Sequence, residues 1–261
     1  MFDILGKQFE DEKSYLDYIV ENEKFIIDTK KSVIKEADNF GAAPILQRDF
    51  SANKSVNEDE ATEILVKLVI NSTNILDSHK DVHIPGLWDK SLKERGDKIL
   101  HLQEHVRKFS HVISRGEDLK AYVETLTWKS LGFNLKGKTQ ILGFDSLVKQ
   151  SQNTEMFKEY KNGNITEHSV GMQYVKMVTC INDEDYPVQK ENWDKYAPEV
   201  ANSEALEKTK VFWAVTEAKA IEGSAVLMGS NSFTPTRQAI PKELTKTEKN
   251  IQAYKSWLNI K

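Results

Sequence analysis

Residues 166–181 (TEHSVGMQYVKMVTCI) are rich in β-branched and aromatic side chains and predict one long strand. Residues 62–72 (TEILVKLVINS) predict another, and 211–228 predict one or two more with an interruption near Gly223. Shorter strands are expected at 98–105, 110–115 and 119–128. This order fits a mostly antiparallel sheet or barrel with peripheral helices better than alternating βαβ units. The expected fold class is therefore α+β or mainly β.

Helices are expected around these strands. Ser14 is the predicted N-cap of the first helix, and the pair Asn162-Gly163 is predicted to stop the fourth. The five predicted helices are 14–22, 25–38, a short one ending near Arg95, 142–160 and an amphipathic one at 243–260. The strands 110–115 and 119–128 flank Gly116-Glu117-Asp118, which predicts a hairpin.

The composition excludes several classes of protein. The 261 residues include 36 Lys and Arg against 40 Asp and Glu, so the net charge of −4 offers no basic face for nucleic acid. The single cysteine excludes an internal disulfide framework and a Cys-based zinc cluster. No apolar run approaches the ~18 residues of a membrane span, and the N-terminus is too acidic for a signal peptide. We expect a soluble intracellular protein without nucleic-acid or membrane partners.

The charge is unevenly distributed. Residues 1–60 carry a net charge of −6, and residues 61–261 a net charge of +2. We expect an acidic helical N-terminal arm and linker at 1–60, a main domain at 61–240 with a polar, irregular excursion at 182–210, and a C-terminal helix at 241–261. Two alternatives hold for the arm: a targeting or scaffold-like segment released by cleavage in the linker 41–60, or a helical pair packed on the domain.

One short segment suggests a metal site. If residues 77–83 are extended, then the side chains of Asp77, His79, Asp81 and His83 share one face, as His and carboxylate ligands would. The segment follows a strand, however, and Asp and Ser are ordinary turn residues, so a turn is the favoured interpretation. No glycine-rich phosphate loop or dinucleotide fingerprint is present. We expect neither a metal nor a cofactor.

A serine in the long predicted strand is the second chemical candidate. Ser169 precedes Val170 and the small Gly171, which would let a substrate backbone approach closely. A serine nucleophile needs a base and a group that orients the base, and His105 and Glu222 lie on other predicted strands.

Other residues compete for these roles. His101 shares a strand face with His105 at even spacing and competes as the base, whereas His168 points away from Ser169. Cys180 lies among apolar residues and is a weaker nucleophile candidate. Spacing alone does not decide among these candidates.

Several segments occur in an order that resembles a known protease family. They are 77–81 (DSHKD), 82–88 (VHIPGLW), 102–105 (LQEH), 111–114 (HVIS), 118–123 (DLKAYV), 163–172 (GNITEHSVGM), 222–226 (EGSAV) and 229–231 (GSN). Together they resemble the prohead maturation proteases of tailed phages, which are related to the herpesvirus assemblins. The similarity covers residues 62–236. Lys80, Glu104 and Val106 depart from the Gly, Gln and Asp of the family pattern.

The resemblance implies a fold and a function. It implies an assemblin-like, mostly antiparallel β-barrel and a serine endopeptidase with Ser169 as nucleophile, His105 as general base and Glu222 orienting His105. The implied substrates are scaffold segments, the major capsid protein and often the protease itself, inside the assembling procapsid in the host cytoplasm. Self-association as a homodimer or higher homo-oligomer is also implied. The alternatives are an inactive capsid-assembly scaffolding protein with the same fold, and a binding domain without a phage connection.

Overall fold

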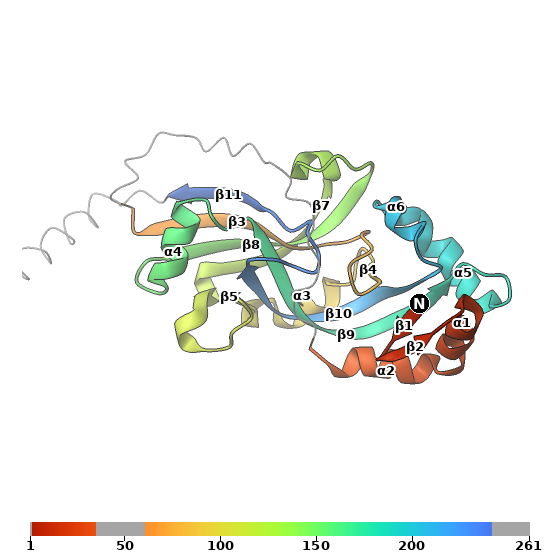
Figure 1. Cartoon of the computed structure of the whole chain (residues 1–261). Helices are drawn as coiled ribbons and strands as arrows, with labels where there is room; N and C mark the ends of the chain where they lie inside the picture. Colours follow the sequence, from red (N-terminus) through yellow and green to blue (C-terminus); the bar gives the residue numbers. More distant parts are fainter. Residues whose placement is uncertain (1, 35–60, 242–261) are drawn as a thin grey trace, which may run out of the picture.

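The structure, a computed structural model, describes residues 2–34 and 61–241 (Figure 1). The predicted linker 41–60 and C-terminal helix 243–260 lie outside the described residues. Two larger sheets with mostly antiparallel strands form the centre, and helices lie around them, so the α+β class with peripheral helices is confirmed. No helix in the described ranges combines the length and apolar character that a bilayer span requires.

The five-stranded sheet is built on one long antiparallel pair, β9 (Glu167–Ile181) and β10 (Val211–Val226). The predicted strand at 211–228 is therefore continuous, although bulges shift its register between residues 215 and 222. Two short strands, β4 (Asp81–His83) and β5 (Leu100–Gln103), pair with β10 in parallel. The strand β6 (Val112–Arg115) completes the sheet beside β5.

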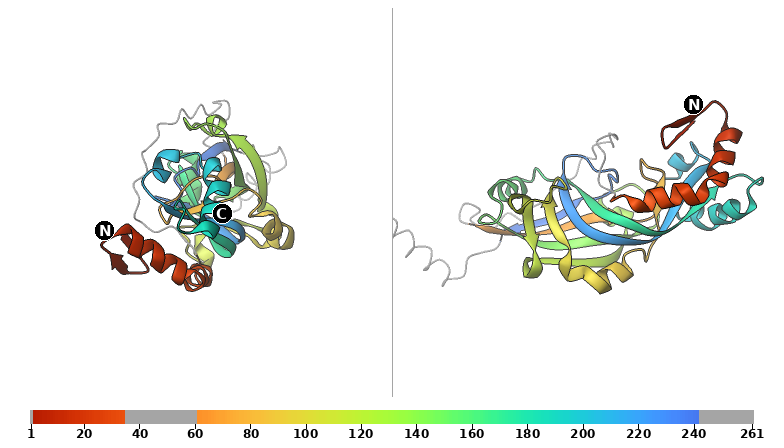
Figure 2. Two further views of the ribbon diagram at one scale, coloured as in Figure 1. Left: turned by 90° about the vertical axis from the view of Figure 1, so that its right-hand side faces the viewer. Right: turned by 90° about the horizontal axis from the view of Figure 1, so that it is seen from below.

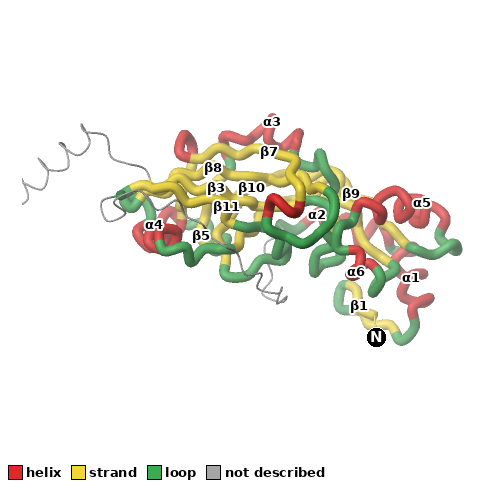
Figure 3. The backbone as a smooth tube through the Cα atoms, turned by 90° about the horizontal axis from the view of Figure 1, so that it is seen from above, coloured by secondary structure: helices red, strands yellow, loops and turns green. Residues whose placement is uncertain are grey.

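The four-stranded sheet is antiparallel throughout and has the order β11-β3-β8-β7 (Figure 3). Its strands are β3 (Glu63–Ser72), β7 (Leu119–Thr127), β8 (Lys138–Lys149) and β11 (Thr236–Pro241). The two sheets meet closely at Gly223, where an added Cβ would lie 2.6 Å from the ring of Phe144. The expected closed barrel is wrong, because the described strands form separate hydrogen-bonded sheets.

The predicted hairpin at 110–128 is also wrong, and this explains the open architecture. Residues Gly116–Asp118 form a 3₁₀ turn, with Gly116 at φ 59°, that carries the chain from one sheet to the other. As a result β6 pairs with β5, whereas β7 pairs with β8. A short loop containing Gly favours a hairpin locally, but the two flanking strands pair with β5 and β8 instead of with each other.

The predicted helix at 142–160 is instead the end of β8 followed by α4 (Thr154–Lys161). Ile141, Leu142 and Phe144 are all buried, so this strand lacks the alternation that identifies a half-exposed strand. The stop near Asn162-Gly163 is confirmed, with Gly163 at φ 72°.

The short helix is confirmed as α3 (Asp89–Arg95). The excursion is helical rather than irregular, with α5 (Pro187–Tyr196) and α6 (Ser203–Leu206).

The N-terminal segment consists of a small hairpin and two helices. The hairpin is β1 (Phe2–Ile4) with β2 (Lys7–Phe9), and the helices are α1 (Glu12–Glu21) and α2 (Glu23–Ser32). Asp11, rather than Ser14, caps α1, because its carboxylate accepts the backbone N–H of Ser14 at 2.8 Å.

Both N-terminal helices pack on the main domain beside β9 and β10 (Figure 2). Leu16, Ile19 and Ile26 are almost fully buried and belong to the largest apolar core. The hydroxyl of Tyr186, next to α5, donates to Asp17 at 2.7 Å. The described part of the acidic segment is therefore a packed helical pair.

This packing predicts unequal effects of two neighbouring substitutions on α2. Ile26 is 1% exposed and Phe25 is 61% exposed. Ile26→Ala should lower the free energy of unfolding by ~2–4 kcal/mol, because it leaves a cavity under the helix. Phe25→Ala should change it by less than ~0.5 kcal/mol. Urea denaturation measures both values, and equal small effects would show that α2 is not part of the folded core.

Candidate functional site

The register of β9 and β10 determines which side chains meet. Ser169 lies opposite Ser224, and Gly171 lies opposite Glu222. Directly opposed residues of an antiparallel pair project from the same face. A register shift between Ala220 and Glu222 bends β10 at this point. Ser169, Ser224 and Glu222 therefore occupy one face of the sheet.

His105 joins this face through a closed ring of three hydrogen bonds. Its Nδ1 lies 2.6 Å from Glu222 Oε1, and its backbone N–H donates to Ser224 Oγ at 3.1 Å. The Ser224 hydroxyl in turn donates to Glu222 Oε2 at 2.6 Å. Glu222 is 1% exposed, so its carboxylate is buried with both oxygens hydrogen-bonded. The ring holds the imidazole of His105 in one orientation.

An unusual backbone conformation brings His105 over β10. The strand β5 ends at Gln103, and Glu104 donates its N–H to the carbonyl of Ala225 at 2.9 Å. Glu104 and His105 then both have positive φ, 51° and 57°. Such conformations cost ~1–3 kcal/mol each outside glycine and persist where the surroundings enforce them, often at functional sites.

Gly171 is required by the Glu222 carboxylate. A Cβ at Gly171 would overlap Glu222 Oε1, because the carboxyl group lies directly on the glycine. The expectation that Gly171 admits a substrate backbone is therefore replaced by a different reason: it leaves room for the partner of His105. Neither this role nor that of Ser224 was predicted, although the two-residue spacing of Glu222 and Ser224 places both on one strand face.

The structure thus brings His105 and Glu222 into direct contact and places Ser169 on the same strand face, opposite Ser224. Ser169 is 6% exposed. It lines a narrow pocket of about 10 Å³, close to the volume that one water molecule needs. Asn71, His83 and Tyr174 form part of the wall of this pocket.

His101 belongs to a different, fully buried network. Its Nδ1 contacts Ser146 Oγ at 2.8 Å, and its Nε2 contacts the hydroxyl of Tyr160 at 3.1 Å. The same hydroxyl contacts His168 Nε2 at 3.0 Å. Burial, and then the neighbouring His168, hold the pKa of His101 well below its usual value. The competing base therefore has two structural partners and contacts neither Ser169 nor Glu222.

The four candidate ligands at 77–83 have separate partners rather than one shared centre. Asp77 forms a turn, in which its Oδ1 accepts the N–H groups of His79 at 2.8 Å and Asp81 at 2.9 Å. Burial, and then the charge of Asp81, raise the pKa of Asp77 to about 6. Asp81 pairs with Lys30, and His83 contacts Asn71. In residues 2–34 and 61–241, no group of three or more His, Cys, Asp or Glu is arranged to hold a metal ion.

Cys180 is fully buried in a second apolar cluster, to which Trp193 of α5 also belongs. Burial raises the pKa of its thiol to about 12, so the thiolate is scarce at neutral pH. This environment is that of a small core residue and not of a nucleophile.

Comparison of the chain with models of known families, with curated proteins and with solved structures finds no match. The site is therefore interpreted from its own geometry and chemistry.

Gly171→Ala should damage the site directly. The new methyl group must displace the Glu222 carboxylate, which breaks the ring of hydrogen bonds and costs ~1–3 kcal/mol of stability. Gly96→Ala is the matched control, because the nearest atom to an added Cβ there lies 4.0 Å away. Urea denaturation compares the two variants, and a Gly171→Ala protein as stable as the control would contradict the described contact.

The buried His101 predicts a pH effect on stability. Its folded pKa is depressed, so the unfolded chain takes up a proton below pH ~6.5 while the folded protein does not. This contribution to stability is fully present above pH ~6.5 and is lost as the pH falls. Relative to His101→Gln, the wild type should lose up to ~2 kcal/mol more between pH 7.5 and pH 5. Denaturant unfolding at both values measures it, and parallel pH curves would contradict the assignment.

Proposed function

We propose that the protein is a serine endopeptidase with Ser169, His105 and Glu222 as its catalytic triad. The observation that carries this proposal is the 2.6 Å contact between His105 Nδ1 and the buried Glu222 carboxylate, on the strand face that Ser169 shares. An ionised carboxylate only accepts hydrogen bonds, so Nδ1 carries the proton and Nε2 is left as the basic nitrogen.

The acylation step uses each residue in a distinct role. His105 Nε2 accepts the proton of the Ser169 hydroxyl as Oγ attacks the carbonyl carbon of the scissile peptide. Glu222 stabilises the imidazolium that forms and keeps the ring in its orientation. His105 then gives the proton to the leaving amine, the C–N bond breaks, and an acyl-enzyme ester remains on Ser169.

Deacylation repeats the sequence with water. His105 accepts a proton from a water molecule that attacks the ester, and it then returns the proton to Ser169 as the carboxylic acid product leaves. The net reaction consumes one water molecule and needs no cofactor. The ring through Ser224 lets His105 act in both steps without losing its partner Glu222.

The substrate class and setting follow from the sequence resemblance. We infer that the substrates are scaffold segments and the major capsid protein, cleaved inside the procapsid in the host cytoplasm, on an assemblin-like fold. Self-association and cleavage of the protein's own linker at 41–60 belong to the same proposal. Genes for portal and major capsid proteins beside this gene support the phage setting, and their absence counts against it.

Fluorophosphonate labelling tests the catalytic proposal. The wild-type chain, alone and with its capsid protein, should form a covalent adduct that peptide mass spectrometry locates at Ser169. Ser169→Ala should not be labelled, and Glu222→Gln should react ~10²–10⁴-fold more slowly, because His105 loses its orienting charge. Ser203→Ala on α6 is the control for an exposed serine and should react as the wild type does.

The outcomes separate the two functional classes. A folded wild type that is not labelled in either condition favours the inactive scaffolding protein. Labelling at a serine other than Ser169 overturns the triad but leaves a hydrolase.

A further inference from the structure

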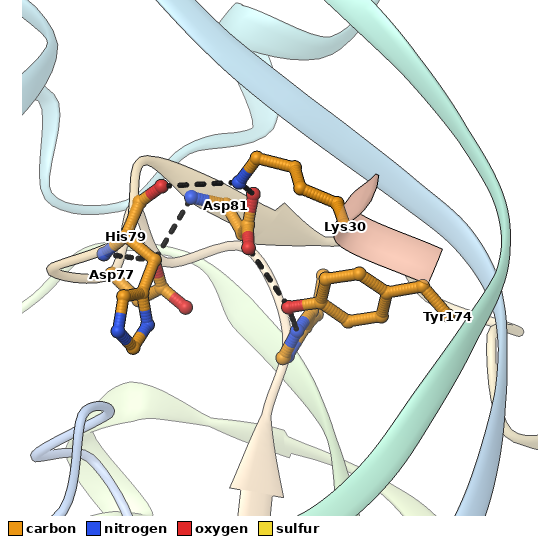
Figure 4. Close-up of polar contacts among 6 residues, drawn as sticks. Lys30, Asp77, His79, Asp81 and Tyr174 are labelled. Atoms are coloured by element: carbon orange, nitrogen blue, oxygen red, sulfur yellow. Dashed lines mark hydrogen bonds and ion pairs between the residues drawn. The ribbon is translucent and has the colours of Figure 1, made fainter. Parts of the chain in front are cut away.

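The N-terminal helix α2 supplies a cation to a buried carboxylate of the main domain (Figure 4). Lys30 Nζ lies 2.6 Å from Asp81 Oδ1, with side chains 11% and 0% exposed. The same ammonium group contacts the carbonyl of His79 at 3.4 Å and lies 4.2 Å from the ring centroid of Trp213. A buried carboxylate is costly without such a partner.

The other oxygen of Asp81 begins a chain of hydrogen bonds. Asp81 Oδ2 accepts the hydroxyl proton of Tyr174 at 3.0 Å, as Figure 4 shows. The Tyr174 oxygen lies 3.2 Å from His83 Nε2, and His83 Nδ1 lies 2.8 Å from the Asn71 amide nitrogen. Asp81, Tyr174, His83 and Asn71 are all buried.

The donors and acceptors in this series of hydrogen bonds can be assigned by starting from Asn71, the residue farthest from Asp81. The indole nitrogen of Trp88 only donates, and it lies 3.3 Å from Asn71 Oδ1. The Asn71 amide nitrogen therefore donates to His83 Nδ1, which leaves the proton of His83 on Nε2. His83 donates this proton to Tyr174, and Tyr174 donates to Asp81. Asp81 thus accepts the last hydrogen bond of this series, beside the ammonium group of Lys30.

The hydrogen-bond chain ends at a pocket that Ser169 also lines. Asn71, His83 and Tyr174 line the same pocket as Ser169. Tyr174 lies on β9, the strand that carries Ser169. A change in the hydrogen bonds of Asp81 therefore reaches the wall of a pocket that Ser169 also lines. Asp77 lies near Asp81 and also lines the pocket, so two carboxyl groups are close together here. Removal of the Lys30 charge would leave them without this nearby cation.

We propose that Lys30 is a positioning residue for the reaction at Ser169, acting through Asp81, Tyr174 and His83. The inference rests on the proposed protease function and extends it: the N-terminal helical pair is part of the catalytic unit. Helix α2 thus contributes the largely buried cation that pairs with Asp81.

The test compares Lys30→Met with Lys24→Met in the full-length chain. Lys24 is exposed on the same helix and serves as the matched control. At a temperature where circular dichroism shows both variants folded, Lys30→Met should react with a fluorophosphonate ~10–10²-fold more slowly at Ser169 than the wild type. Lys24→Met should stay within ~2-fold of the wild-type rate.

The double variant Lys30→Met/Asp81→Asn, which removes both charges, should recover most of the labelling rate. A folded Lys30→Met that reacts at the wild-type rate, or a double variant without recovery, overturns the proposal.

A second readout is independent of activity. The ¹⁵N shifts of the His83 imidazole in the wild type should report a neutral ring with its proton on Nε2, and Lys30→Met should change them while Lys24→Met should not. Unchanged His83 shifts in Lys30→Met overturn the role of Lys30 even if the wild type is never labelled. An unlabelled wild type in which Lys30→Met shifts His83 overturns the protease function alone and retains the coupling from Lys30 to the pocket.

Discussion

The register of the β9–β10 pair is the constraint on which the other features depend. A slip of one residue would turn Ser169 and Glu222 to the opposite faces of the sheet and move Gly171 away from the carboxylate that needs its space. The pair is long enough to serve two purposes. One end carries the ring that includes His105, and the other carries the surface on which α2 and α5 pack. The site and the N-terminal segment are thus joined by the same two strands.

Three histidine environments show how burial and partners give one residue type different roles. His105 contacts a carboxylate and lies on the face of Ser169, which suits proton transfer. His101 has only neutral partners in a fully buried site, which keeps it uncharged. His83 lies in a hydrogen-bond chain that ends in a carboxylate and a lysine. Of these three, only His105 contacts a carboxylate on the strand face that Ser169 occupies.

The contacts of the acidic N-terminal segment show what holds it on the main domain. Its net negative charge suggests an appended arm. In residues 2–34, however, the buried face is apolar, and the largely buried Lys30 pairs with Asp81 of the main domain. Surface ion pairs such as Lys13 with Asp185 add little to stability because both side chains are well exposed. Apolar burial and the Lys30–Asp81 pair therefore account for the docking of the segment.

The sequence predicted long strands at 62–72 and 166–181, one or two strands at 211–228, and the α+β class, and the family resemblance supplied the three residues of the candidate triad. Strong β-branched runs and an ordered set of motifs were sufficient for these. The assembled fold was needed to show that β6 and β7 belong to different sheets, that residues 138–149 form a strand, and that His101 hydrogen-bonds with Ser146 and Tyr160. Strand pairing, burial on both faces and the direction of a chain after a strand ends depend on contacts between residues distant in sequence. Local patterns carry no information about those contacts. The positions of Gly171 and Ser224 beside Glu222, and of Lys30 beside Asp81, therefore emerge only from the assembled fold.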